Sequence, residues 1–176
     1  MVALLRGINV GGSGKLPMEE LRAAAESIGL TQVRTYIQSG NVVFAAPGRE
    51  PDVVSSELRA AIAQTTAVDP EVIVRTRDDL AVTVDADPFV ARGDDPAHVH
   101  IRFFADDARR LLEGLDLAPF APEEVVPLGR EMHVLLPTGA GRSKLAVALD
   151  RHLGRVGTMR SWRTVTTLLG MLDEVG

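Results

Sequence analysis

Two short glycine-containing segments, each with a lysine and each followed by an apolar helical pattern, carry the residues best suited to bind an anion. They are residues 11–15 (Gly-Gly-Ser-Gly-Lys) and residues 139–144 (Gly-Ala-Gly-Arg-Ser-Lys). Backbone N–H groups at a helix N-terminus favour phosphate or carboxylate, and a nearby cation adds to this. The first segment is not a P-loop, because Asn9 stands where that motif needs its first glycine and Leu-Pro follows Lys15. The structural alternatives are a flexible connection at Lys15 and an ordinary helix N-cap at Ser143.

A second polar set surrounds the first predicted strands. Arg34, Tyr36 and Gln38 alternate with other residues, so they are predicted to share one face of a sheet, of the kind that binds ligands or RNA in some folds. Gly40 is assigned to a hairpin turn. The candidate ligand-binding residues are Arg6, Asn9, Lys15, Arg34, Gln38, Asn41, Arg142, Ser143, Lys144, Arg160 and Trp162. For Trp162 the simplest interpretation is a core anchor at the start of a helix.

Other kinds of chemistry have little support. The chain has no cysteine, which excludes disulfides, thiolate metal sites and cysteine nucleophiles. His98 and His100 lie two residues apart, but Asp94 and Asp95 are the only acids close by in sequence to add a third ligand. Ser39 lacks the Gly-x-Ser-x-Gly elbow of acyl transfer. We therefore predict no metal site and no cofactor, and whether the protein is an enzyme stays open.

Composition and charge place the chain among folded proteins. It has 176 residues, of which 45% are hydrophobic and 24% charged, and it has no apolar run long enough to span a membrane and no signal-like start. A cytoplasmic location and no membrane partner are expected. Residues 1–41 carry a net charge of +1, residues 42–141 of −9 and residues 142–176 of +3. The total of −5 disfavours a general nucleic-acid coat protein, but the basic ends leave room for a local anion site.

The first half of the chain has the order strand, helix, strand, strand, helix, strand. This order is typical of the ferredoxin-like βαββαβ unit. The helices are marked by apolar residues at helical spacing after Pro17 and after Pro51, and the hairpin by Ser39-Gly40-Asn41. The predicted strands are residues 2–5, 33–37, 42–44 and 72–74.

The second half nearly repeats the pattern. Strands are predicted at 98–104, 125–126 and 133–136, and helices at 78–84, 106–115, from Ser143 to Gly154, and at 161–172. The fold class is therefore α+β, with two ferredoxin-like (βαββαβ-type) halves and an extra C-terminal helix. The predicted halves are residues 1–84 and 97–176, with residues 85–96 as a polar linker. The oligomeric state stays open.

Four segments carry a family resemblance: residues 4–12, 33–44, 141–145 and 158–165. Together they resemble a bacterial family of domains of unknown function, number 1697. Ser161 stands where that family usually has Asn, and Met159 where Thr is common. The resemblance implies two similar α+β halves and implies no reaction.

The residues favour an anionic small molecule or nucleotide bound at the Gly/Lys-containing helix N-termini. One alternative is a nucleic-acid-binding ferredoxin-like module, although Tyr36 is the only tyrosine and the paired stacking aromatics of such sheets are missing. The other is a structural or interaction protein without a ligand, in which the motifs serve packing.

Overall fold

The fold is mixed α+β with two four-stranded antiparallel sheets. The computed structural model describes residues 1–9, 14–154 and 156–175. The chain divides into two compact units: unit 1 is Met1–Ala81 with Thr167–Gly176, and unit 2 is Val82–Thr166. The predicted α+β class is confirmed.

The division between the units differs from the predicted halves. Residues 82–96 belong to unit 2, although they were assigned to the end of the first half and to a linker. The C-terminal residues from Thr167 belong to unit 1. Two helices, α3 (Arg77–Asp85) and α6 (Trp162–Asp173), therefore run continuously across the division. A helical periodicity reports one apolar face but not which unit that face packs against.

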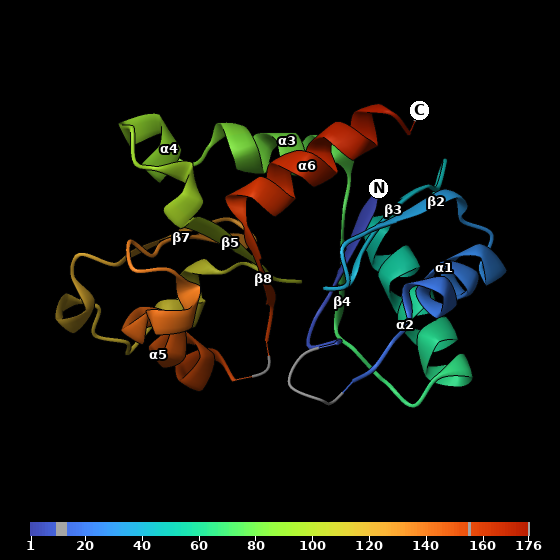
Figure 1. Cartoon of the computed structure of the whole chain (residues 1–176), viewed down its shortest axis with the longest axis horizontal. Coiled ribbons are helices and arrows are strands. Elements are labelled where there is room, and N and C mark those ends of the chain that lie inside the picture. The colour runs from blue at the N-terminus through green and yellow to red at the C-terminus, as the bar shows by residue number, and fades with distance from the viewer. Residues whose placement is uncertain (10–13, 155, 176) are drawn as a thin grey trace. The chain divides into compact units, whose positions relative to one another are not determined.

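Unit 1 contains the sheet that we call sheet 1. Its strands have the order β2-β3-β1-β4, and each neighbouring pair is antiparallel. Two helices, α1 and α2, lie side by side against one face of this sheet (Figure 1). The elements are β1 (Val2–Leu5), α1 (Met18–Ser27), β2 (Thr31–Tyr36), β3 (Asn41–Ala45), α2 (Pro51–Thr65) and β4 (Val72–Arg75).

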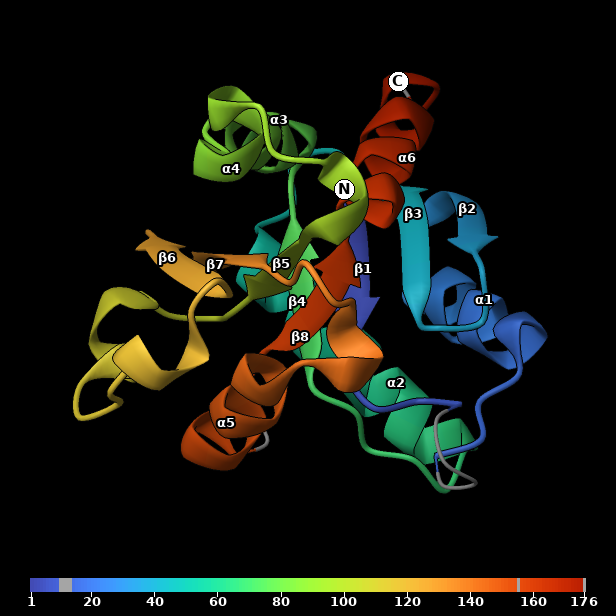
Figure 2. The ribbon, with the colours of Figure 1, turned by 60° about the vertical axis from the view of Figure 1, so that its left-hand side comes forward.

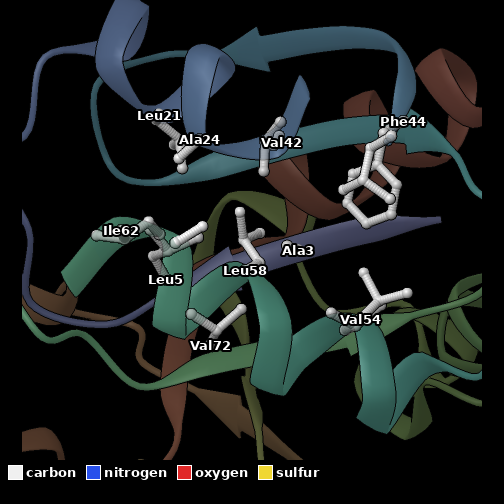
Figure 3. Packing of buried hydrophobic residues seen from close by; sticks show 14 of the residues in the cluster. Ala3, Leu5, Leu21, Ala24, Val42, Phe44, Val54, Leu58, Ile62 and Val72 are labelled. Carbon is white, nitrogen blue, oxygen red and sulfur yellow. The ribbon is translucent and has the colours of Figure 1, made fainter. Parts of the chain in front are cut away.

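The core of unit 1 follows from the two periodicities of its sequence. Alternate strand residues such as Ala3, Leu5 and Val42 face the helices, and the apolar stripe of each helix packs down onto them. Figure 3 shows Leu21 of α1 and Leu58 of α2 among these side chains. The predicted strands and helices of this half are confirmed, with ends shifted by a few residues.

Unit 2 contains sheet 2, with the strand order β6-β7-β5-β8. Helix α4 and helix α5 lie on opposite sides of strands β5 and β7 (Figures 1 and 2). Val134 packs in the α5 cluster, whereas Val99 and Leu135 pack with Phe89 of α4. The elements are α4 (Pro88–Arg92), β5 (Val99–Phe103), β6 (Glu124–Leu128), β7 (Glu131–Leu135), α5 (Lys144–Leu153) and β8 (Thr158–Ser161).

Two predictions for this half are wrong. The helix predicted at residues 106–115 is a bend followed by a single 3-10 turn, Arg109–Leu112. The backbone N–H of Ala108 donates to the Gly129 carbonyl (2.7 Å), and Asp107 Oδ1 accepts from the Arg109 N–H (2.8 Å). These bonds compete with the helical pattern. The predicted linker contains helix α4, whose Phe89 is buried.

Candidate functional site

Asn9 holds together one end of sheet 1. Its side-chain Nδ2 donates to the carbonyls of Leu16 and Gln38, and its Oδ1 accepts from the Leu16 N–H, all at 2.9 Å. Its backbone N–H donates to the Gly14 carbonyl (2.9 Å). One amide side chain thus joins the connection between β1 and α1 to the turn between β2 and β3. The left-handed backbone of Asn9 (φ 55°) suits asparagine better than most residues.

Gly40 and Asn41 serve the same junction. The N–H of Leu5 donates to the Gly40 carbonyl (2.8 Å), and a Cβ at Gly40 would lie 2.8 Å from side-chain atoms of Leu5 and Ile8. Asn41 is fully buried, and its Nδ2 donates to the Tyr36 carbonyl (3.0 Å). The structural interpretation of Gly40 is confirmed, and the Asn41 amide is used inside the hairpin.

The cationic candidates Arg6 and Lys15 lie on the same connection. Arg6 is half-buried, and its backbone N–H donates to the Glu71 carbonyl (2.9 Å). Lys15 is exposed and makes no hydrogen bond or ion pair with any residue that the structure describes. Helix α1 follows with Pro17 as its N-cap and without a side-chain cap. Residues 11–13 of the predicted glycine-containing segment lie outside the described residues.

The start of α5 is organised differently. Ser143 is the N-cap that the sequence predicts, and its Oγ accepts from the Ala146 N–H (2.8 Å). Glu123 Oε2 accepts from the Leu145 N–H (2.9 Å), so the protein's own carboxylate bonds an N-terminal amide of this helix. Arg142 and Lys144 beside it are exposed. Sequence reasoning missed Glu123, because nothing local connects it to a helix that begins 21 residues later.

Arg34 and Gln38 are exposed but do not share a strand face. Arg34 lies on β2, and its Nη1 donates to Glu174 Oε2 (2.6 Å). Gln38 lies in the turn, because β2 ends at Tyr36 and the left-handed backbone at Ile37 (φ 47°) reverses the chain. The strand therefore ends two residues before Gln38, and the alternation that placed Gln38 beside Arg34 does not reach it.

Arg160 and Trp162 belong to unit 2. Arg160 is buried on β8, where its Nη1 donates to Thr158 Oγ1 (2.6 Å) and to the Met159 carbonyl (2.9 Å). Burial lowers the pKa of Arg160 to about 10. Trp162 packs against Phe89 and its neighbours on sheet 2, so its interpretation as a core anchor is confirmed.

Five candidates thus gather at one end of sheet 1: Arg6, Asn9, Lys15, Gln38 and Asn41. The others lie on other elements, at Arg34, Arg142, Ser143, Lys144, Arg160 and Trp162. In the described parts of the chain, no group of three or more His, Cys, Asp or Glu side chains is placed to hold a metal ion. None of the helices searched in those parts is long and apolar enough to cross a membrane.

Comparison with known proteins agrees with the motifs. Residues 1–133 match the profile of the family described as "Protein of unknown function (DUF1697)". The chain belongs to this family. Two of the four segments that carry the resemblance, residues 4–12 and 33–44, lie inside the matched region, and the first of them includes Asn9.

A solved structure has a similar fold. It is that of the conserved bacterial protein SP0830 from Streptococcus pneumoniae, which is 23% identical, with 97% of each chain covered and a TM-score of 0.72. At this identity the likeness concerns the fold. A search of the curated proteins finds no match.

Proposed function

We propose that this member of the family binds an anionic small molecule or nucleotide at the start of α1 in unit 1. The observation that carries the proposal is a difference between two helix starts. The start of α1 has no side-chain cap and follows the exposed Lys15, whereas the start of α5 is bonded by Ser143 and Glu123. An uncapped N-terminus with a cation beside it attracts an anion, and a carboxylate already in place competes with one.

The charges around α1 favour a small anion over a polyanion. Lys15 provides positive charge beside the helix start, and the bonds of Asn9 hold the neighbouring Leu16 in place before a ligand arrives. Glu19 and Glu20 in the first turn reduce the positive potential. We therefore expect recognition of one phosphate or carboxylate group, with affinity that falls as salt concentration rises.

We also infer that both units are ferredoxin-like. The support is the strand order, because β2-β3-β1-β4 and β6-β7-β5-β8 place the strands of each unit in equivalent positions. In unit 1, helix α1 connects β1 to β2 and helix α2 connects β3 to β4, as the βαββαβ order requires. In unit 2, helix α5 connects β7 to β8, but 3-10 turns stand between β5 and β6 where a helix is expected. Such sheets serve many functions, so the proposed activity rests on the site and not on the fold.

The test is a thermal-shift titration with inorganic phosphate, nucleoside monophosphates and simple phosphate esters. We expect at least one of them to raise the melting temperature of the wild type and of Lys144→Ala, but not of Lys15→Ala. Lys144→Ala is a matched control, because the chain has only two lysines and both are exposed at the start of a helix. No shift with any of these anions, or an equal shift in Lys15→Ala, would contradict the proposal.

The alternative functions receive less support. Tyr36 is the only tyrosine of the chain, and the segment around it lacks the paired aromatic residues on which RNA-binding sheets stack bases. A purely structural role for the motifs predicts burial of their charged members, but Arg34 and Lys144 are exposed. A cytoplasmic location stays a prediction from the sequence.

A further inference from the structure

A buried carboxylate–imidazole pair lies in unit 2, whereas the proposed anion site belongs to unit 1. Asp87 precedes α4, and its Oδ1 accepts from the N–H groups of Phe89 (3.0 Å) and Val90 (2.8 Å). Its Oδ2 lies 2.6 Å from Nδ1 of His133 on β7, and both side chains are 1% exposed. One carboxylate therefore caps α4 and also ties the helix to the centre of sheet 2.

The remaining attachments of α4 are of two other kinds. Phe89 packs in an apolar cluster with Val99 and Leu135, and Trp162 lies against the same cluster. Arg92 at the end of α4 pairs with Glu124 of β6 (2.8 Å), but both of these side chains are nearly half exposed. An exposed pair of this kind contributes little, so the buried pair is the main polar attachment of the helix.

We propose that Asp87 and His133 form an acid-sensitive latch that holds α4 on sheet 2, and that protonation of the Asp87 carboxyl releases α4 before the rest of unit 2 unfolds. A protonated carboxyl places an O–H where two backbone N–H groups and the imidazole need acceptors. The buried donors then lose part of their hydrogen bonding, which is costly away from water.

The direction of the pH dependence follows from Asp87. Burial by itself would raise the pKa of this carboxyl, but the hydrogen bonds from His133, Val90 and Phe89 outweigh burial and hold the pKa below its usual range. Such a group stabilises the folded protein above its unfolded pKa of about 3.9, and the contribution is lost as pH falls through the lower folded value. Release of α4 is therefore expected below about pH 4.

The surrounding charged groups do not provide a second titrating partner for Asp87 in the described part of the chain. On the side of sheet 2 that carries His133, β5 offers only Val99, Ile101 and Phe103. Arg160 lies in register with Ile101, two strands away from His133. The other charged groups of the elements packed around the pair are Glu131 of β7, Glu124 of β6, Arg92 of α4 and the exposed Arg163 of α6.

Two local probes can follow the latch. Trp162 is the only tryptophan and lies against the cluster beneath α4, so its fluorescence reports the packing of that helix. Hydrogen exchange of the Phe89 and Val90 amides reports the cap directly, and far-UV circular dichroism reports global unfolding. On lowering the pH of the full-length protein, we expect Trp162 fluorescence to change and both amides to exchange several-fold faster before the circular dichroism changes.

Variants separate the latch from general acid unfolding. Asp87→Asn keeps an acceptor for the cap but loses the charge, so α4 should be loosened already at neutral pH and the acid step should disappear. Glu124→Gln breaks the exposed attachment of the same helix and should leave the acid step unchanged. An acid step in Asp87→Asn like that of the wild type would overturn the proposal. Where Asp87→Asn does not fold, the wild type alone decides: simultaneous change of all three signals would also overturn it.

Discussion

The two sheets have equivalent strand orders but carry different residues at equivalent positions. In sheet 1 a row of side chains in register runs through Val43, Val2 and Arg75, and in sheet 2 the matching row runs through His133, Ile101 and Arg160. Both rows end in a buried arginine on the last strand. The position on the strand is thus shared, although no sequence motif links Arg75 to Arg160.

The two rows differ at their first residue, which lies on β3 in sheet 1 and on β7 in sheet 2. Val43 is apolar and needs no hydrogen-bond partner, whereas His133 is buried to the same degree and bonds to Asp87. Asp87 comes from the segment before β5, at the start of helix α4. A polar residue on an inner strand of a sheet thus requires a covering segment that brings its partner, because burying a polar group without a hydrogen bond costs free energy.

The largest loss of stability is expected when His133 is replaced by valine, the residue that sheet 1 has at the equivalent position. His133→Val leaves the Asp87 carboxylate buried without its imidazole partner, which should reduce the free energy of unfolding by about 3–5 kcal/mol. Urea denaturation measures the loss. The double variant His133→Val with Asp87→Asn should recover part of it, since no charge is then left unpaired. A loss below about 1 kcal/mol, the size of a surface ion pair, would show that the pair is unimportant for stability.

A second test concerns the residue before the last strand. Gly157 occupies the position that Val72 has in sheet 1, but it has φ 75°, and a Cβ there would lie 2.6 Å from the Phe103 carbonyl oxygen. Gly157→Ala should lower the free energy of unfolding by about 3 kcal/mol, because the left-handed backbone and the overpacking each cost roughly 1–3 kcal/mol. Gly129→Ala is the control: its φ is 60° but a Cβ would meet no atom within 4 Å, so about 1 kcal/mol is expected. Equal losses in urea denaturation would contradict the packing argument.

A third test concerns the end of sheet 1. Asn9→Ala removes three side-chain hydrogen bonds and should lower the free energy of unfolding by about 1–3 kcal/mol. Gln38→Ala should have little effect, because Asn9 bonds to the backbone carbonyl of Gln38 and the Gln38 side chain is exposed. Thermal unfolding of both variants checks this. A greater loss in Gln38→Ala would place the important contact on its side chain instead.

A fourth test compares the two helix starts. Ser143→Ala removes the N-cap of α5 and should cost about 1 kcal/mol. Lys15→Ala, before the uncapped α1, should leave stability without ligand nearly unchanged, because Lys15 has no partner among the described residues. Chemical denaturation in a buffer without phosphate separates the two. A substantial loss in Lys15→Ala would assign this lysine a structural role.

The smallest loss of stability is expected from replacing Arg34 on β2, the edge strand of sheet 1. Arg34→Ala breaks an ion pair with Glu174 in which both side chains are at least half exposed, so the loss should be less than about 1 kcal/mol. The difference from the wild type should shrink at high salt, because exposed charges are screened. A difference that persists at high salt would indicate that the arginine stem contributes packing.

Sequence patterns predicted the regular elements well where each element has a clear periodicity. The stripe of Leu21, Ala24 and Ala25 predicted α1, and Ser143 predicted the start of α5. The patterns failed at residues 106–115, where the chain bonds to a hairpin turn, and at α4, which is only five residues long. Of the candidate site, Arg6, Asn9 and Lys15 were identified from their motif, but the bonds of Asn9 to Leu16 and Gln38 were not predicted.

The sequence by itself determined the family, the α+β class, most strands and helices, and the residues from which an anion site could be built, because these depend on local periodicity and motifs. Only the tertiary structure decided how the polar residues are used. Asp87 and His133 are 46 residues apart, and Glu123 and Leu145 are 22 apart. Each pair meets because its elements pack together, and burial then requires each donor to find an acceptor. Packing therefore left the start of α1 uncapped and closed the start of α5 with a carboxylate of the protein itself.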